Sequence, residues 1–295
     1  TRLVNKVLAY NLCIALNSSA QLLWKISGNG LEKPSYIFGT HHLAPLSIKD
    51  SITSMAQVIN ETNQVYGEII MSETNTPAFM QEAQRMMKMP TDTTLQSLFT
   101  SEQYELLGKI VKEYLMTDIS MLAQVKPTII NLQLEVVFSL KYFKDSNLQQ
   151  SIDAYFQQQA QQNGKKVGGL ETTRSQLDML FNRQTLQRQA QLLYCAISHI
   201  EKTIEQNKKI VNYYKAQDLD SILCLMEEKE GSSCDPLPNE MEILLDKRNK
   251  AWTKKMPIIM KEAPTLFVVG GGHLPGNNGV LNLLKQQGYI IAPMK

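Results

Sequence analysis

The chain alternates between short apolar runs and longer stretches with helical spacing. Runs rich in β-branched and aromatic residues predict strands over 22–26, 35–38, 64–71, 165–170, 265–269 and 289–292. Apolar residues three and four positions apart predict helices over 48–60, 174–228, 239–261 and 278–287. Strands at both ends, each followed by a helix, predict an α/β fold with a mainly parallel central sheet surrounded by helices.

The middle of the chain has a different character. From about residue 76 to 162, Met, Gln, Leu and charged residues recur at helical intervals, with breaks at Pro90 and Pro127. We interpret 76–162 as a large helical insertion within a single domain over 21–295.

The first residues have the pattern of a secretory signal. Arg2 and Lys6 precede an apolar stretch over 7–16, and Ser18 and Ala20 then supply small residues at a suitable spacing. Residues 1–20 are therefore predicted to be a signal-peptide remnant, and the protein to be exported to the periplasm or secreted. The alternative is an amphipathic N-terminal helix docked on the domain.

Composition narrows the possible partners. The 295 residues include 43% hydrophobic residues, enough for a full core, and 30 Lys+Arg against 28 Asp+Glu give a net charge of +2. This balance gives no reason to expect nucleic-acid binding. Beyond the leader, no segment reaches the roughly 20 uninterrupted apolar residues of a membrane span.

Three cysteines follow the predicted leader. A polar, glycine-containing loop separates Cys224 from Cys234, so these two could pair in an oxidising compartment. Three unpaired thiols, with Cys195 as the third, are the alternative. No pair has the Cys-x-x-Cys spacing of a zinc ribbon or a thioredoxin-type centre.

Histidine is concentrated at two glycine-containing strand exits. Each exit consists of an apolar strand, a glycine, two residues and a histidine, and these histidines are His42 and His273. In a parallel sheet both would follow the carboxyl ends of strands, where α/β folds place ligands. A hydrogen-bonded turn residue is the alternative for each, and His41 is expected to point away from His42 on extended backbone. His199 lies in a helical block and is interpreted as structural.

Two acids and an arginine complete the candidate site. Glu68 interrupts a β-prone run, where a carboxylate is costly to bury unless it is paired or bound to a metal; an exposed face is the alternative. Glu171 follows another strand and has an equally good interpretation as a first-turn helix acid. Arg248 and Asn249 lie in a polar helical stretch that periodicity alone interprets as a solvated face.

Two imidazoles with one or two carboxylates form a plausible site for a divalent metal that activates water. The same groups could act without a metal, with His42 as general base and Glu68 orienting it. The glycine-rich segment 270–279 lacks the ending of a phosphate loop, and no Gly-x-Ser-x-Gly nucleophile elbow occurs.

At these residues the sequence resembles the TraB/GumN family, which also contains the TIKI-type metalloproteases. The segments that carry the resemblance are 23–26 (LWKI), 36–42 (YIFGTHH), 169–172 (GLET), Arg248-Asn249 with Trp252, and 269–276 (VGGGHLPG) with Gly279-Val280. It extends from about residue 21 to 292, and the paired Gly-x-x-His motifs are its most specific part. The family usually has a single His where this chain has His41 and His42.

The resemblance implies a fold related to the erythromycin-esterase and haem-binding ChaN group. It implies a site with His42, His273 and Glu68, a divalent metal, with manganese or cobalt favoured and zinc possible, and Arg248 as a contact to the substrate or transition state. We therefore expect an exported metal-dependent peptidase in which His42, Glu68 and His273 hold the metal and Glu171 and Arg248 assist. Its partner would be a peptide or small-molecule substrate. A non-catalytic haem-, metal- or peptide-binding protein and a metal-free esterase or amidase are the alternatives.

Overall fold

A computed structural model describes residues 21–143 and 150–295. The predicted leader over 1–20 lies outside the described residues. The strands of the described chain are β1 (Leu23–Gly28), β2 (Ser35–Thr40), β3 (Gln64–Gly67), β4 (Lys166–Gly169), β5 (Thr265–Gly270) and β6 (Tyr289–Met294).

These strands form one mostly parallel sheet with the order β4-β3-β5-β2-β1-β6. The four strands β4, β3, β5 and β2 all run parallel, while β1 pairs antiparallel with β2 and with β6. The predicted α/β fold with a mainly parallel central sheet is therefore confirmed. The parallel strands lie side by side although β2 and β5 are more than 200 residues apart, so their carboxyl ends share one edge of the sheet.

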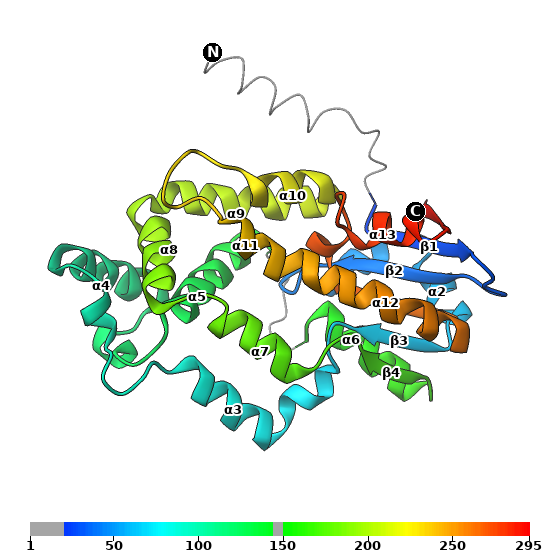
Figure 1. Ribbon diagram of the computed structural model, residues 1–295, viewed down its shortest axis with the longest axis horizontal. Coiled ribbons are helices and arrows are strands. Elements are labelled where there is room, and N and C mark those ends of the chain that lie inside the picture. Colours follow the sequence, from blue (N-terminus) through cyan, green and yellow to red (C-terminus); the bar gives the residue numbers. More distant parts are fainter. Residues whose placement is uncertain (1–20, 144–149) are drawn as a thin grey trace, which may run out of the picture.

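Twelve α-helices surround this sheet in the described residues (Figure 1). They are α2 (Met55–Glu61), α3 (Pro77–Met87), α4 (Ser101–Leu115), α5 (Pro127–Leu140), α6 (Ile152–Gln162), α7 (Thr173–Asn182), α8 (Leu186–Ser198), α9 (Ile200–Lys215), α10 (Leu219–Glu227), α11 (Pro238–Met241), α12 (Lys247–Glu262) and α13 (Val280–Gln286). None of these described helices combines the length and the apolarity that crossing a bilayer would require.

Helices cover both faces of the sheet. On one face, the Phe38 ring of β2 contacts the Phe156 ring of α6 edge-on, with centroids 5.6 Å apart. On the other face, Gln64 of β3 donates a 2.8 Å hydrogen bond to the carbonyl of Ile259 in α12. The chain moves along the sheet in one direction from β2 to β3 and β4, and in the opposite direction from β4 to β5. Because connections between parallel strands are right-handed, the helices of these two parts lie on opposite faces.

The block over 174–228 is four helices rather than one. Side-chain caps mark the breaks, since Thr185 accepts a hydrogen bond from the backbone of Arg188 at the start of α8, and Asp218 from that of Ser221 at the start of α10. Apolar spacing continues across these caps, so periodicity alone does not show them.

A second helical body packs beside the sheet, on the left in Figure 1. Its core joins residues of α4, α5 and α8, including Leu107, Leu134 and Leu193. The chain between β3 and β4 supplies α3–α6, and the chain between β4 and β5 supplies α7–α12. The body therefore combines the helices around 76–162 with helices from later in the chain.

A disulfide joins Cys195 of α8 to Cys234, with Cα atoms 5.8 Å apart. The two possibilities that the sequence left open, a Cys224–Cys234 pair and three unpaired thiols, are therefore both wrong. Helix α10 continues past Cys224 to Glu227, and the loop that follows returns to α8. Arg188 of α8 anchors that loop by donating hydrogen bonds to the carbonyls of Ser233 and Asp235, at 2.7 and 2.8 Å.

Candidate functional site

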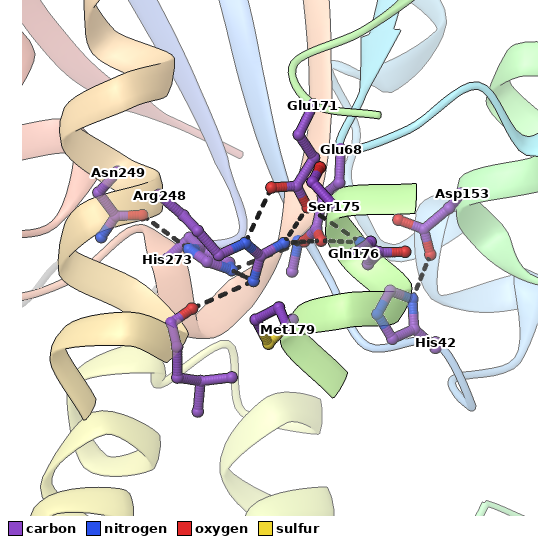
Figure 2. A network of polar contacts seen from close by, with 12 residues as sticks. His42, Glu68, Asp153, Glu171, Ser175, Gln176, Met179, Arg248, Asn249 and His273 are labelled. Atoms are coloured by element: carbon purple, nitrogen blue, oxygen red, sulfur yellow. Dashed lines mark hydrogen bonds and ion pairs between the residues drawn. The ribbon is translucent and has the colours of Figure 1, made fainter. Parts of the chain in front are cut away.

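Four of the predicted site residues follow the four parallel strands. His42 follows β2, Glu68 follows β3, Glu171 follows β4 and His273 follows β5. Because these strand ends share one edge of the sheet, the topology brings side chains from distant parts of the sequence together (Figure 2).

Arg248, in the first turn of α12, links three of these residues. Its Nη2 lies 2.6 Å from Glu68 Oε2 and 2.6 Å from Glu171 Oε1, and its Nη1 lies 2.9 Å from His273 Nε2. The Arg248 side chain is only 11% exposed, and Asn249 is buried. The interpretation of this stretch as a solvated face is therefore wrong, because the helix turns these polar residues toward the strand ends.

Local backbone geometry and an aromatic ring fix the direction of this arginine. A π-helical turn (Glu242–Asp246) precedes α12, and Arg248 Nη1 donates a 3.1 Å hydrogen bond to the carbonyl of Leu244 in that turn. The guanidinium also lies over the Trp252 ring, 4.8 Å from its centroid, and that ring packs against His273 at 4.3 Å.

Glu68 is a buried carboxylate with donors on both oxygens. Oε1 accepts a 2.8 Å hydrogen bond from the backbone N–H of Gly270, and Oε2 accepts one of 2.9 Å from Gln176 besides the Arg248 contact. A Cβ at Gly270 would lie 3.1 Å from Oε1, so glycine permits this approach. Burial alone would raise the pKa of Glu68, but His273, Arg248, His42 and the Gly270 N–H outweigh it and lower the pKa to about 2.

His273 is buried and neutral. Burial lowers its pKa to about 3, and the nearby Arg248 acts in the same direction. Asn249 donates through Nδ2 to the carbonyl of Asn278, so its Oδ1 is the acceptor for His273 Nδ1–H at 2.6 Å. The unprotonated Nε2 then accepts from Arg248 and lies 3.8 Å from Glu68 Oε1.

His42 lies in a contrasting environment. Its side chain is 65% exposed, and its Nδ1 lies 2.9 Å from Asp153 Oδ2. The negative charge of Asp153 raises the pKa of His42 to about 9, so the ring is cationic at neutral pH. Thr40 donates a 2.8 Å hydrogen bond to the other Asp153 oxygen. His41 points elsewhere and packs its ring against Phe143 and Tyr214.

Sequence reasoning missed Asp153 and Gln176. Asp153 begins α6, where an acid is usually interpreted as a favourable first-turn charge. Its burial, and that of Gln157 one turn later, shows that polar side chains share the inward-facing side of this helix with Ile152 and Phe156. The sequence signal for Asp153 was therefore a carboxylate on the apolar side of a predicted helix. Gln176 of α7 carries no such signal, because helix α7 is polar on most of its surface.

The site contains a small pocket. It is lined by residues that include His42, Glu68, Asp153 and Gln176, and its volume is about 20 Å³, enough for about one water molecule or one ion. His273 lies behind Glu68 and Arg248 rather than on the pocket wall (Figure 2). Among residues 21–143 and 150–295, no three His, Cys, Asp or Glu side chains converge to form a ready metal site.

This arrangement offers four chemical functions within one network. Glu68 is an ionised acceptor, Arg248 is a fixed cation, His273 is a neutral imidazole, and His42 is an accessible imidazolium. Such a combination can bind a polarised carbonyl, accept a proton and donate one to a leaving group.

Comparisons with known proteins match most of the described chain. The model of the TraB/PrgY/gumN family matches residues 22–293. Metalloprotease TIKI2 of Danio rerio is 21% identical over 91% of this chain, and metalloprotease TIKI1 is 23% identical over 91% in both Danio rerio and Xenopus tropicalis. The chain spans 60–62% of the length of these relatives. No solved structure matches, so the expected relation to the erythromycin-esterase and ChaN fold stays a prediction.

Proposed function

This chain belongs to the TraB/PrgY/gumN family, and from that premise we propose that it is an exported hydrolase that cleaves peptide bonds with a divalent metal. The TIKI relatives are named metalloproteases, which supports the reaction class. The Cys195–Cys234 disulfide supports export, since disulfides persist mainly in oxidising compartments.

The observation that carries the proposal is the way the two imidazoles are held. In both His42 and His273 the Nδ1 atom faces an oxygen, from Asp153 in one and from Asn249 in the other. Metal-binding histidines are usually oriented in this way, with the second ring nitrogen left as the ligand. Glu68 supplies a carboxylate beside them, and imidazole with carboxylate suits manganese, cobalt or zinc.

The donor types therefore suit a divalent metal, with His42, His273 and Glu68 as the residues that would hold it. These side chains do not yet converge into a metal site in the described structure, so binding an ion would require them to move closer together. Arg248 contacts both Glu68 and His273 Nε2, so its guanidinium must move aside before these atoms can bind an ion. Glu171 already holds the other side of the guanidinium and offers it a position. When bound, the metal would polarise the substrate carbonyl and lower the pKa of water.

The chain's own residues account for the remaining chemistry. Glu68, ionised and buried, accepts a proton from the attacking water. Glu68 then passes this proton to the departing amine, because His42 is cationic only while its second ring nitrogen binds no ion. After it moves aside, Arg248 keeps its ion pair with Glu171 and remains a buried cation that can stabilise the negative charge developing on the carbonyl oxygen.

The test combines metal content with cleavage. Protein purified without chelator is analysed for bound metal, and peptide cleavage is measured with and without added manganese in the wild type, His42→Ala and Glu68→Ala. His199→Ala is the matched control, because His199 is exposed and lies outside the site. We expect metal-stimulated cleavage that is lost in the two site variants and retained in the control. Unchanged cleavage in folded His42→Ala and Glu68→Ala proteins would refute the assignment.

A metal-free esterase or amidase is the second candidate, and the Arg248 contacts favour it. The guanidinium already neutralises Glu68 and donates to His273, which are the functions a metal would otherwise serve. Full activity after dialysis against chelator, with no metal detected in the protein, would select this candidate.

A further inference from the structure

A second, larger pocket lies between the 3-10 helix η2 (Met71–Asn75), the start of α3 and the start of α7. Its volume is about 290 Å³ and its walls include Ala78, Phe79 and Leu177. Leu177 belongs to a buried cluster of apolar side chains that Phe79 also packs against. The pocket is therefore an opening over an existing hydrophobic core.

Two of these elements, η2 and α7, also line the small pocket of the candidate site. In η2, Met71 lines the site pocket and Glu73 lines the larger one; in α7, Gln176 lines the first and Leu177 the second. Two residues of 3-10 helix rise about 4 Å, and an extended peptide advances about 3.3 Å per residue. Because residues two apart in η2 and adjacent in α7 line the two pockets, a peptide bound with its reacting bond at Glu68 would need to extend by only a few residues to place a side chain in the larger pocket.

Two acids line this pocket, and one of them, Glu82, is neutralised by arginines. Glu82 of α3 accepts from Arg174 of α7 at 2.6 Å and from Arg85 at 2.7 Å. This pairing joins α3 to α7 across the pocket and leaves its floor apolar. The volume is at the lower limit of ligand pockets, which begin at about 300 Å³, so it suits one side chain rather than a larger ligand.

We propose that this pocket is a substrate subsite for one bulky apolar side chain, such as Leu, Met or Phe, of a peptide. The inference rests on the proposed peptidase function and adds the side chain that the enzyme selects. Burying such a side chain contributes about 1.5–3 kcal/mol, which corresponds to a preference of about 10- to 150-fold. Specificity of this size would appear in kcat/KM.

The test fills the pocket from its rim. Ala78→Trp places a large side chain in the opening, and Gln84→Trp adds the same side chain to an exposed position of α3 outside the lining residues. Peptides carrying Phe or Ser at each of the four positions that flank the cleaved bond are compared. We expect the wild type and Gln84→Trp to prefer Phe by about tenfold or more at one position, and Ala78→Trp to lose that preference. Cleavage with the same Phe-to-Ser ratio in all three proteins would overturn the subsite while the peptidase function stands.

A binding measurement distinguishes failure of the subsite from failure of the proposed peptidase function. N-acetyl-phenylalanine amide is titrated into the wild type and both variants and followed by NMR. Binding to the wild type and Gln84→Trp, but not to Ala78→Trp, supports the subsite even if no peptide is cleaved. Equal binding to all three proteins, or binding to none, overturns it.

Discussion

The two Gly-x-x-His turns have the same local sequence pattern but opposite chemical environments. His42 and His273 each lie three residues after a glycine at the end of a parallel strand. His42 is exposed beside Asp153, and its pKa is raised to about 9. His273 is buried between Asn249, Trp252 and Arg248, and its pKa is lowered to about 3.

The difference teaches that the motif positions an imidazole but does not set its charge. At both glycines the missing Cβ permits a close approach, of Gly271 to Gly39 and of the Glu68 carboxylate to Gly270. Charge is set by desolvation and by neighbouring charges, which come from helices far away in the sequence. One motif used twice therefore yields a cationic imidazole and a neutral one.

Removing each imidazole is expected to give the largest effect. His42→Ala and His273→Ala should each lower kcat/KM for peptide cleavage by about 100-fold or more, as expected for a lost acid–base or metal-binding group. Stability should distinguish them. His273→Ala leaves a cavity and an unpaired Asn249 oxygen and should cost about 2–4 kcal/mol, whereas the exposed His42 should cost less than about 1 kcal/mol. Urea unfolding measures both, and equal losses would contradict the contrast.

Asp153→Asn should reduce the difference between the pKa values of His42 and His273. Without the negative charge, the pKa of His42 is expected to fall from about 9 toward 6.5, while that of His273 stays near 3. Titration of the two rings by NMR measures this directly. If His42 is the proton donor, the loss of activity at high pH should move to lower pH in the variant. An unchanged pKa of His42 would show that Asp153 does not control it.

The pKa shifts of His42 and His273 make the free energy of unfolding depend on pH in opposite directions. The pairing of His42 contributes in full below about pH 6.5 and is lost as the pH rises through about 9. Neutral burial of His273 contributes in full above about pH 6.5 and is lost as the pH falls through about 3. Ionised Glu68 acts in the same direction as His273, contributing above its ordinary value of 4.5 and being lost as the pH falls through about 2.

Arg248→Gln tests whether the guanidinium competes with a metal at only one of the two turns. Arg248 contacts His273 and Glu68, and it makes no direct hydrogen bond to His42. Removing it should tighten manganese binding by about tenfold, since charge-assisted hydrogen bonds no longer have to break. Calorimetric titration with manganese alone measures this, with the exposed Arg85→Gln as control. Unchanged or weaker binding would refute the competition.

Thr40→Val should have the smallest effect. The substitution keeps the shape of the side chain but removes the hydrogen bond to Asp153. A loss of about 1–2 kcal/mol in the free energy of unfolding is expected, together with a pKa of His42 that remains raised, because the negative charge is still present. A fall of that pKa to its ordinary value would show that the hydroxyl, rather than the charge, holds the ring.

Local pattern was sufficient for the strands and for bringing the candidate residues to one edge of the sheet. The apolar runs before His42 and His273 predicted two strand exits, and the parallel sheet places both at one edge together with Glu68 and Glu171. This worked because strand periodicity is a short-range property and because parallel strands direct their carboxyl ends to the same edge.

Some features required contacts between distant segments. Arg248 appeared solvated because its neighbours in α12 are polar, but the fold turns it against Glu68, which is 180 residues away. The loop sequence allows Cys234 to pair with Cys224, yet Cys234 pairs with Cys195 of α8.

The sequence by itself determined that histidines and acids gather where parallel strands end, since hydrophobic patterning specifies the strands and their direction. Only the tertiary structure decided which groups face each imidazole, and hence which ring is charged. The physical reason is that burial and Coulomb interactions depend on distance in space, and Asp153 and Arg248 approach their histidines only after helices α6 and α12 pack on opposite faces of the sheet.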